Sequence, residues 1–290
     1  MKPPAPSSSS SLHLRRAWRI VAGLMLPCLL ALAARAQPSG GPYGPIQQRY
    51  ELPQAKRIYY VAPEGNADSA GTALEQPTTL ESAVSRVVTG DAIVLRGGTY
   101  RTGGLVLNQG VTIQPYADER PVLKGTEVAA EWVAQPNGLW RTAWKKFFPA
   151  APADWWRRER QGKLTPLYLF NNDMLFIDGE LLSAVGGEHE MTEKSYYIDY
   201  EAGQIYIGTN PANRLVEITT QDSALVRTIR DAHGKQNDRK GPVIRGITFT
   251  QYAYRALEIE GTEPMKYMSP DEFGKEVVGS VLEHLTISFC

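Results

Sequence analysis

The chain has 290 residues, 42% of them hydrophobic, which is enough to bury a core in one or two domains. Its 26 glycines and 20 prolines suit a turn-rich fold and, because they follow no period, exclude a collagen-like chain. The 31 basic and 31 acidic residues cancel, yet five of the basic ones and none of the acidic ones precede residue 37.

The first 36 residues are typical of a secretory signal peptide. A basic start precedes a short apolar run at 20–33, which ends in Ala34-Arg35-Ala36. The run is shorter than the about 20 apolar residues of a membrane span, and Pro27 interrupts it. We therefore predict cleavage between Ala36 and Gln37, export to the periplasm or the extracellular medium, and no stable membrane insertion afterwards.

Removal of residues 1–36 would leave 26 basic and 31 acidic residues, a formal charge of 26 − 31 = −5. A nucleic-acid-binding surface would need clustered basic residues, so we expect no nucleic-acid partner. Cys290 would be the one remaining cysteine of this sequence, which excludes an intrachain disulfide. We expect a monomer whose stability rests on its core and on its backbone hydrogen bonds.

A linker and an amphipathic helix are predicted next. Residues 37–57 are rich in Pro, Gly and Gln and are predicted to be the linker, and a short strand follows at 58–63. Thr78 and Glu81 have the spacing of a capping box, and Gly90 is predicted to end a helix of about three turns. The apolar stripe of this helix consists of Leu80, Ala83, Val84, Val87 and Val88.

Short apolar segments then follow one another at short intervals. They lie at 92–96, 105–107, 111–113 and 121–125, with a turn predicted at 97–100. Strands of this length, separated by polar corners, favour a coil that turns every few residues over a sandwich of hairpins. The residues thus predict a β-solenoid.

One stretch of this region resembles a known superfamily. It contains Gln76-Pro77-Thr78-Thr79-Leu80 and then Gly90-Asp91-Ala92-Ile93-Val94-Leu95-Arg96-Gly97-Gly98-Thr99-Tyr100. This stretch and residues 111–125 resemble the opening of the pectate-lyase-like right-handed parallel β-helix superfamily. The resemblance implies an all-β fold, with the α-helix capping the N-terminal end of the solenoid and residues 58–128 forming the cap and the first coils. It does not define the chemistry, because many activities share this opening.

Residues 129–240 are predicted to be an inserted small antiparallel β subdomain. Segments 167–170 and 174–177 form one predicted hairpin, and segments 196–200 and 204–208 form another. With Glu131-Trp132 and Gly138-Leu139-Trp140 before them, the arrangement is similar to that of β-helix glycoside hydrolases and related secreted proteins.

Solenoid strands are predicted to resume at 241–290. Gly246-Ile247-Thr248-Phe249 and His284-Leu285-Thr286-Ile287 are predicted to occupy equivalent places in two successive coils. Apolar solenoid strands need a neighbour or a cap, and none follows Phe289-Cys290 in this sequence. We therefore expect an N-terminal fragment, whose unknown catalytic residues lie on coils after Cys290.

Five residues are the candidates for contact with a substrate. Glu258 and Glu260 alternate with apolar residues and would project from one strand face, as the start of an acidic groove or as a solvated polar face. His284 is either a general acid–base group or a structural corner residue. Trp155 and Trp156 either stack on sugars or pack the insertion against the solenoid. No metal site is predicted.

The resemblance implies an exported polysaccharide-degrading protein of the glycoside hydrolase type, with a polysaccharide or oligosaccharide as its partner. Three alternatives stay open: a polysaccharide lyase, a non-catalytic carbohydrate-binding or surface β-helix protein, and an inactive product. The charge of −5 disfavours a lyase for acidic polysaccharides, which would need a basic groove. No cofactor is evident, and calcium is considered solely for the lyase alternative.

Overall fold

The computed structural model describes residues 48–144, 159–160, 162–170, 172–261 and 276–290, all of which belong to the unit Gln47–Cys290. The predicted signal peptide, its Ala36–Gln37 cleavage site, and Trp155 and Trp156 lie outside the described residues. In the part of the chain that is described, no helix is long and apolar enough to span a membrane.

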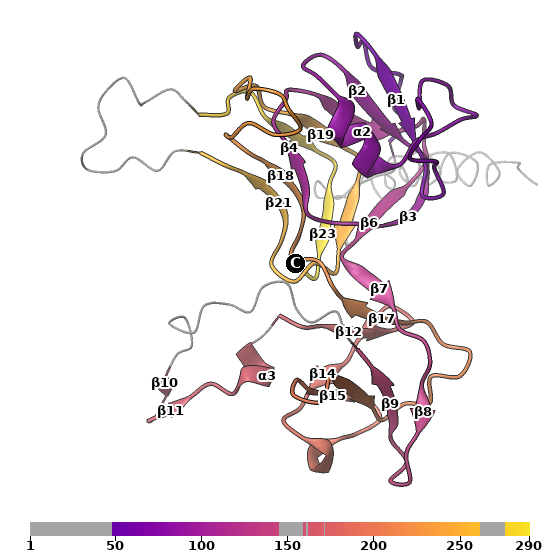
Figure 1. Ribbon diagram of the computed structural model, residues 1–290, viewed down its shortest axis with the longest axis vertical. Helices are drawn as coiled ribbons and strands as arrows, with labels where there is room; N and C mark the ends of the chain where they lie inside the picture. The colour runs from indigo at the N-terminus through magenta and orange to yellow at the C-terminus, as the bar shows by residue number, and fades with distance from the viewer. Residues whose placement is uncertain (1–47, 145–158, 161, 171, 262–275) are drawn as a thin grey trace, which may run out of the picture. The chain divides into compact units, whose positions relative to one another are not determined.

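Most described elements are β-strands, and twelve of them form three parallel sheets (Figure 1). The first sheet has the order β1 (Ile58–Val61), β2 (Ala92–Leu95), β5 (Thr112–Pro115), β19 (Val243–Arg245) and β22 (Val281–Glu283). The second has the order β3 (Gly98–Arg101), β6 (Pro121–Lys124), β20 (Thr248–Thr250) and β23 (Thr286–Ser288). The third has the order β4 (Leu105–Leu107), β18 (Ser223–Arg227) and β21 (Arg255–Ile259).

The chain visits these sheets in a fixed sequence. β2, β3 and β4 are followed by β5, β6 and β18, then by β19, β20 and β21, and finally by β22 and β23. Neighbouring parallel strands need a long crossover connection between them. Here the chain crosses over by passing through the two other sheets before it returns to the first. The strands in these sheets are only three to five residues long.

The three sheets share one hydrophobic core, because register partners are buried together. These buried ladders are Ile93–Ile113–Ile244 in the first sheet, Tyr100–Leu123–Phe249 in the second, and Leu105–Leu225 in the third, next to the partly buried Leu257. Side chains from all three sheets and from Leu80 and Val84 line one void of about 10 Å³. Such a small void indicates close packing around a common centre.

The helix α2 (Leu80–Arg86) buries Leu80, Ala83 and Val84 in this core. Its boundaries differ from the predicted ones. Thr78 is not the N-cap, because its backbone bridges Val61, and the cap is Thr79, whose hydroxyl accepts a hydrogen bond from Ser82 N at 3.2 Å. The carboxylate of Glu81 accepts a hydrogen bond from the Thr102 hydroxyl instead of closing a capping box.

The predicted helix is also too long at its C-terminal end. The last helical residue is Arg86, and Val87 is the C-cap. Gly90 follows in a turn, with a φ of 90°, and Val88 is 43% exposed rather than part of the buried stripe. The predicted turn at 97–100 is wrong as well, because β3 begins at Gly98 and pairs with β6 along its whole length.

Two of the three further sheets in the described residues form the core of the insertion. The β12 sheet has the order β13 (Glu180–Leu181), β12 (Leu175–Ile177), β17 (Val216–Thr219) and β7 (Thr126–Val128). The β16 sheet has the order β14 (Ser183–Ala184), β15 (Ser195–Asp199), β16 (Gln204–Ile207), β9 (Trp140–Ala143) and β8 (Val133–Ala134). Leu175, Ile177, Ile198 and Ile205 belong to one hydrophobic cluster, so the two sheets pack against each other. This core is separate from that of the parallel sheets.

One predicted insertion hairpin is wrong. Residues Leu167–Phe170 form a single helical turn, α3, rather than a strand. Pro166 explains this, because proline favours the start of a helix and its carbonyl accepts a hydrogen bond from Leu169 N. β12 instead pairs with β13 across the Asp178–Gly179 turn. The remaining short elements are β10 (Glu159–Arg160), β11 (Lys163–Leu164) and η2 (Glu188–Glu190).

Two segments lie on the other side of the predicted insertion boundaries. β7, at Thr126–Val128, already belongs to the β12 sheet. β18, at Ser223–Arg227, lies between β4 and β21 in the third parallel sheet, well before residue 241. The reason is that Ala224 and Leu225 are buried in the core of the parallel sheets. In the predicted linker, Tyr50 N donates a hydrogen bond to Ala117 O, so part of that segment is attached to the fold.

Candidate functional site

The strongest group of chemically useful side chains lies where β18 and β21 begin. Asp222 immediately precedes β18, and its carbonyl accepts hydrogen bonds from Tyr254 N at 2.9 Å and Arg255 N at 3.0 Å. Ser223 and Arg255 are register partners in the parallel ladder that follows. Backbone pairing therefore brings Asp222 beside Tyr254 and Arg255.

Arg255 connects the members of this group. Its Nη1 lies 2.6 Å from Oε2 of Glu258, which is three residues further along β21. Its guanidinium carbon lies 4.8 Å from the ring centroid of Tyr254, a ring that is 38% exposed. We call Asp222, Tyr254, Arg255 and Glu258 the β18–β21 cluster.

The Asp222 carboxyl group is the unusual member. Burial raises its pKa, and the positive charge of Arg255 opposes that shift only in part. Its Oδ1 and the Nε of Arg255 are buried atoms for which the described residues provide no hydrogen-bond partner. A carboxyl group that is desolvated in this way keeps its proton at a higher pH than an ordinary aspartate, as a general acid requires.

The two predicted glutamates have different partners. Glu258 belongs to the β18–β21 cluster, whereas Glu260 accepts hydrogen bonds from the Thr228 hydroxyl at 2.6 Å and Ile229 N at 3.1 Å. The hydrogen bond from Thr228 is the main reason why the pKa of Glu260 is lowered, against the opposing effect of burial. Glu260 thus ties the end of β21 to the end of β18, and the pair does not form a continuous acidic groove.

His284 lies on a different corner, between β22 and β23. It adopts a left-handed conformation, with a φ of 50°, at the position equivalent to Gly246 between β19 and β20, where φ is 70°. Its Nδ1 lies 3.1 Å from the Tyr50 hydroxyl. The guanidinium of Arg245 lies 5.6 Å from the centroid of the same Tyr50 ring. The structure therefore gives His284 a partner at this corner and does not bring it to the β18–β21 cluster.

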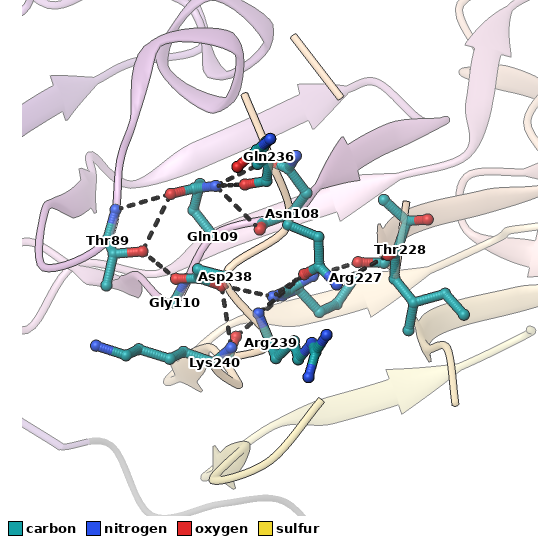
Figure 2. A network of polar contacts seen from close by, with 12 residues as sticks. Thr89, Asn108, Gln109, Gly110, Arg227, Thr228, Gln236, Asp238, Arg239 and Lys240 are labelled. Carbon is teal, nitrogen blue, oxygen red and sulfur yellow. Dashed lines mark hydrogen bonds and ion pairs between the residues drawn. The ribbon is translucent and has the colours of Figure 1, made fainter. Parts of the chain in front are cut away.

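A second polar network surrounds Arg227 at the end of β18 (Figure 2). The Arg227 side chain is 1% exposed, and its Nη2 lies 2.8 Å from Oδ1 of Asp238 while its Nε donates to Lys240 O at 3.0 Å. The other oxygen of Asp238 accepts hydrogen bonds from Gly110 N at 2.9 Å and from the Thr89 hydroxyl. These contacts hold the connection 229–240 against the corner at 108–110 (Figure 2).

The network explains the charge state of Asp238. Burial would raise its pKa, but the hydrogen bonds from Thr89, Gly110 and Lys240 and the charge of Arg227 lower it. Both charged groups are hydrogen-bonded within the protein, as buried charges must be. We assign a structural role to this network.

A third ionic group joins the insertion to the parallel sheets. Glu217 of β17 is fully buried, and its Oε1 lies 2.6 Å from Nη2 of Arg101 and 2.8 Å from Nζ of Lys124. Burial would raise the pKa of Glu217, but hydrogen bonds from these two cations lower it. Arg101 and Lys124 are therefore both engaged by Glu217, and the three groups together keep one net positive charge.

Three members of the β18–β21 cluster were missed in the sequence. Asp222 precedes an apolar strand and the pair Tyr254-Arg255 precedes the alternating Leu-Glu-Ile-Glu run, which are weak signals by themselves. Only parallel pairing brings the two segments together. Within the described residues, no group of three or more His, Cys, Asp or Glu side chains is placed to hold a metal ion.

No family model matches the chain. A stretch of 45 residues, 16% of the chain, is 44% identical to pectate lyase L of Dickeya dadantii (strain 3937) and covers 11% of that protein. The matched stretch of this chain thus spans about a tenth of the length of this relative.

Solved structures extend the likeness to most of the chain. The structure of XylC in complex with xylose is similar over 71% of this chain and 37% of the XylC chain, with a TM-score of 0.52 and 18% identity. A glycoside hydrolase structure is matched over 68% of this chain and 51% of its own, with a TM-score of 0.43 and 14% identity. The first of these shows a shared fold with a little over a third of the XylC chain.

Proposed function

We propose that the three parallel sheets are the first coils of a right-handed parallel β-helix of the pectate-lyase-like superfamily. The fixed order in which the chain visits the sheets supports this, as do the parallel register and the common core. The position of α2 at one end of that core fits a capping helix, since an uncovered solenoid end would expose apolar cross-section. The structural likeness to XylC and the short match to pectate lyase L add to this support.

We further propose that this protein is exported by cleavage of residues 1–36 and acts on a polysaccharide as a glycoside hydrolase. The β18–β21 cluster carries the proposal, in place of the coils after Cys290 that the sequence led us to expect, because it combines a carboxyl group of raised pKa, a second carboxylate, an arginine and an exposed aromatic ring. Glycosidic cleavage uses two carboxyl groups, one of which must donate a proton to the leaving oxygen. The xylose bound to XylC makes a neutral sugar the natural first substrate class to test.

The roles follow from the contacts. Asp222 is the proposed proton donor, Arg255 holds the Glu258 carboxylate in place, and the Tyr254 ring provides a surface on which a sugar can stack. The register separates Asp222 from Glu258 by four positions, about 13 Å along the strands. This backbone offset exceeds both the about 5–5.5 Å carboxyl spacing of retaining enzymes and the about 6.5–9.5 Å spacing of inverting ones, so the register assigns neither stereochemistry.

The test compares the full chain with its Asp222→Asn and Glu258→Gln variants on neutral polysaccharides such as xylan. We expect new reducing ends with the unsubstituted chain and a loss of about 100-fold or more in rate with Asp222→Asn. Glu260→Gln serves as the control, because Glu260 binds Thr228 and Ile229 instead. Cleavage that persists in both cluster variants would move the active site elsewhere in the protein.

A polysaccharide lyase is the second candidate, because the one matched stretch of sequence belongs to a pectate lyase. Arg101 and Lys124 both pair with the buried carboxylate of Glu217, which argues against their holding the carboxylates of uronates. A lyase would release unsaturated products from polygalacturonate in the presence of added calcium. The ultraviolet absorbance of unsaturated products, measured beside new reducing ends, therefore separates the two activities, and binding without cleavage would support a carbohydrate-binding protein.

A further inference from the structure

The outward side of the β16 sheet carries an aromatic row in the insertion. Side chains alternate along a strand, and Tyr196 and Ile198 of β15 face the insertion core, where they are 4% and 8% exposed. Tyr197, which lies between them, therefore faces outward. Its register partner is Tyr206 of β16, and the next partners across the sheet are Arg141 of β9 and Val133 of β8.

The two tyrosines form a stacked pair. Their ring centroids are 5.7 Å apart and their planes differ by 26°. Both are partly exposed, and Val133 at the end of the row is 55% exposed. Cross-strand aromatic pairs stabilise sheets, so stacking by itself would need no ligand. The polar groups around this pair are the observation that indicates a ligand.

Polar groups border the aromatic row. Arg141 continues the row and offers several N–H donors, while Asp199 and Gln204 form the neighbouring outward pair of positions. The pKa of Tyr197 is raised, first by burial and then by the negative charges of Asp199, Glu188 and Glu201 around it. This combination of flat rings with hydrogen-bonding groups suits a sugar chain better than an apolar protein surface.

The charges also indicate which kind of glycan fits. Three carboxylates act on Tyr197, against one arginine in the row, so the surface repels uronates and other acidic sugars. We propose that the outward side of the β16 sheet, centred on Tyr197, Tyr206 and Arg141, is a binding surface for a neutral glycan chain. It is distinct from the β18–β21 cluster and does not depend on the proposed hydrolysis.

The experiment measures the binding of the full chain to soluble neutral polysaccharides, with xylan and glucomannan as the probes and polygalacturonate as the acidic comparison. We expect the double variant Tyr197→Thr with Tyr206→Thr to weaken binding of a neutral glycan at least tenfold. Threonine is chosen because it keeps a high strand propensity. Val128→Thr is the control, because Val128 is an exposed apolar residue of the other insertion sheet, at 49%.

Several results would overturn the inference. They are the absence of neutral-glycan binding by the unsubstituted chain, an equal loss in Val128→Thr, and tighter binding of polygalacturonate. If circular dichroism shows that the double variant does not fold, Arg141→Gln replaces it, with the same expected direction. The reducing-end assay with Asp222→Asn tests the hydrolase proposal and the binding assay with the tyrosine variants tests this one, so the failure of either is distinguishable from the failure of the other.

Discussion

At the residue scale, the corners between strands depend on left-handed backbone. Gly246 has a φ of 70°, and a Cβ there would lie 2.6 Å from the Tyr50 ring and 2.8 Å from Pro115 Cγ. At the equivalent corner between β22 and β23, His284 takes the same conformation without being glycine, and it contacts the same Tyr50. A side chain is therefore accommodated at the His284 corner, whereas at Gly246 its Cβ would clash with the Tyr50 ring.

Gly246→Ala tests this reasoning. A left-handed alanine costs about 1–2 kcal/mol, and the contact with Tyr50 should add to that cost. Gly104→Ala is the control, because Gly104 has a φ of 63° and its added Cβ would meet no atom within 4 Å. We expect urea unfolding to show a larger loss of stability for Gly246→Ala than for Gly104→Ala. Equal losses of stability would mean that the Tyr50 ring moves aside at no measurable cost and that its contact with the new Cβ does not destabilise the protein.

At the element scale, the sequence predicted that α2 exists but placed both of its ends wrongly. The apolar period identifies Leu80, Ala83 and Val84 as the buried face, and that prediction is confirmed. The N-cap depends on which threonine is free to leave the strand, and Thr78 is held there by Val61 and Tyr60. A pattern in sequence cannot reveal that competition, because the strand partner is remote.

Removal of the true cap should destabilise the helix and the core that it covers. We expect Thr79→Ala to lower the free energy of unfolding by about 1 kcal/mol, the usual effect of losing an N-cap hydroxyl. Ser85→Ala is a matched control on the exposed side of the same helix, where alanine is the better helix former. A loss in Ser85→Ala as large as in Thr79→Ala would contradict the assignment of the cap.

At the scale of the whole molecule, two hydrophobic cores are joined by Glu217. The ion pairs from Arg101 and Lys124 of the parallel sheets end on this fully buried carboxylate of the insertion. We expect Glu217→Gln to destabilise the protein by about 3 kcal/mol or more, because two cations lose their partner. The insertion should then unfold before the parallel sheets.

Tryptophan fluorescence can follow that separation, because all tryptophans except Trp18 lie between residues 132 and 156. In the unsubstituted chain, fluorescence and circular dichroism should report one urea transition, and in Glu217→Gln the fluorescence should change first. The pKa of Glu217 is lower in the folded chain, so its contribution is present above the unfolded value of about 4.3 and is lost as the pH falls. Glu217→Gln should therefore lose less stability on acidification than the unsubstituted chain. Coincident fluorescence and circular dichroism transitions in Glu217→Gln would contradict the inference that Glu217 joins the two cores.

The sequence by itself determined the features that depend on local pattern. These are the short strands, the apolar stripe of α2, and the equivalence of residues 246–249 and 284–287, which the register Thr248–Thr286 confirms. Only the tertiary structure decided which remote groups meet. Asp222 and Arg255 are neighbours because β18 and β21 pair in parallel, and Glu217 meets Lys124 because β17 joins β7. Such contacts depend on register between distant strands, and no local propensity specifies that register.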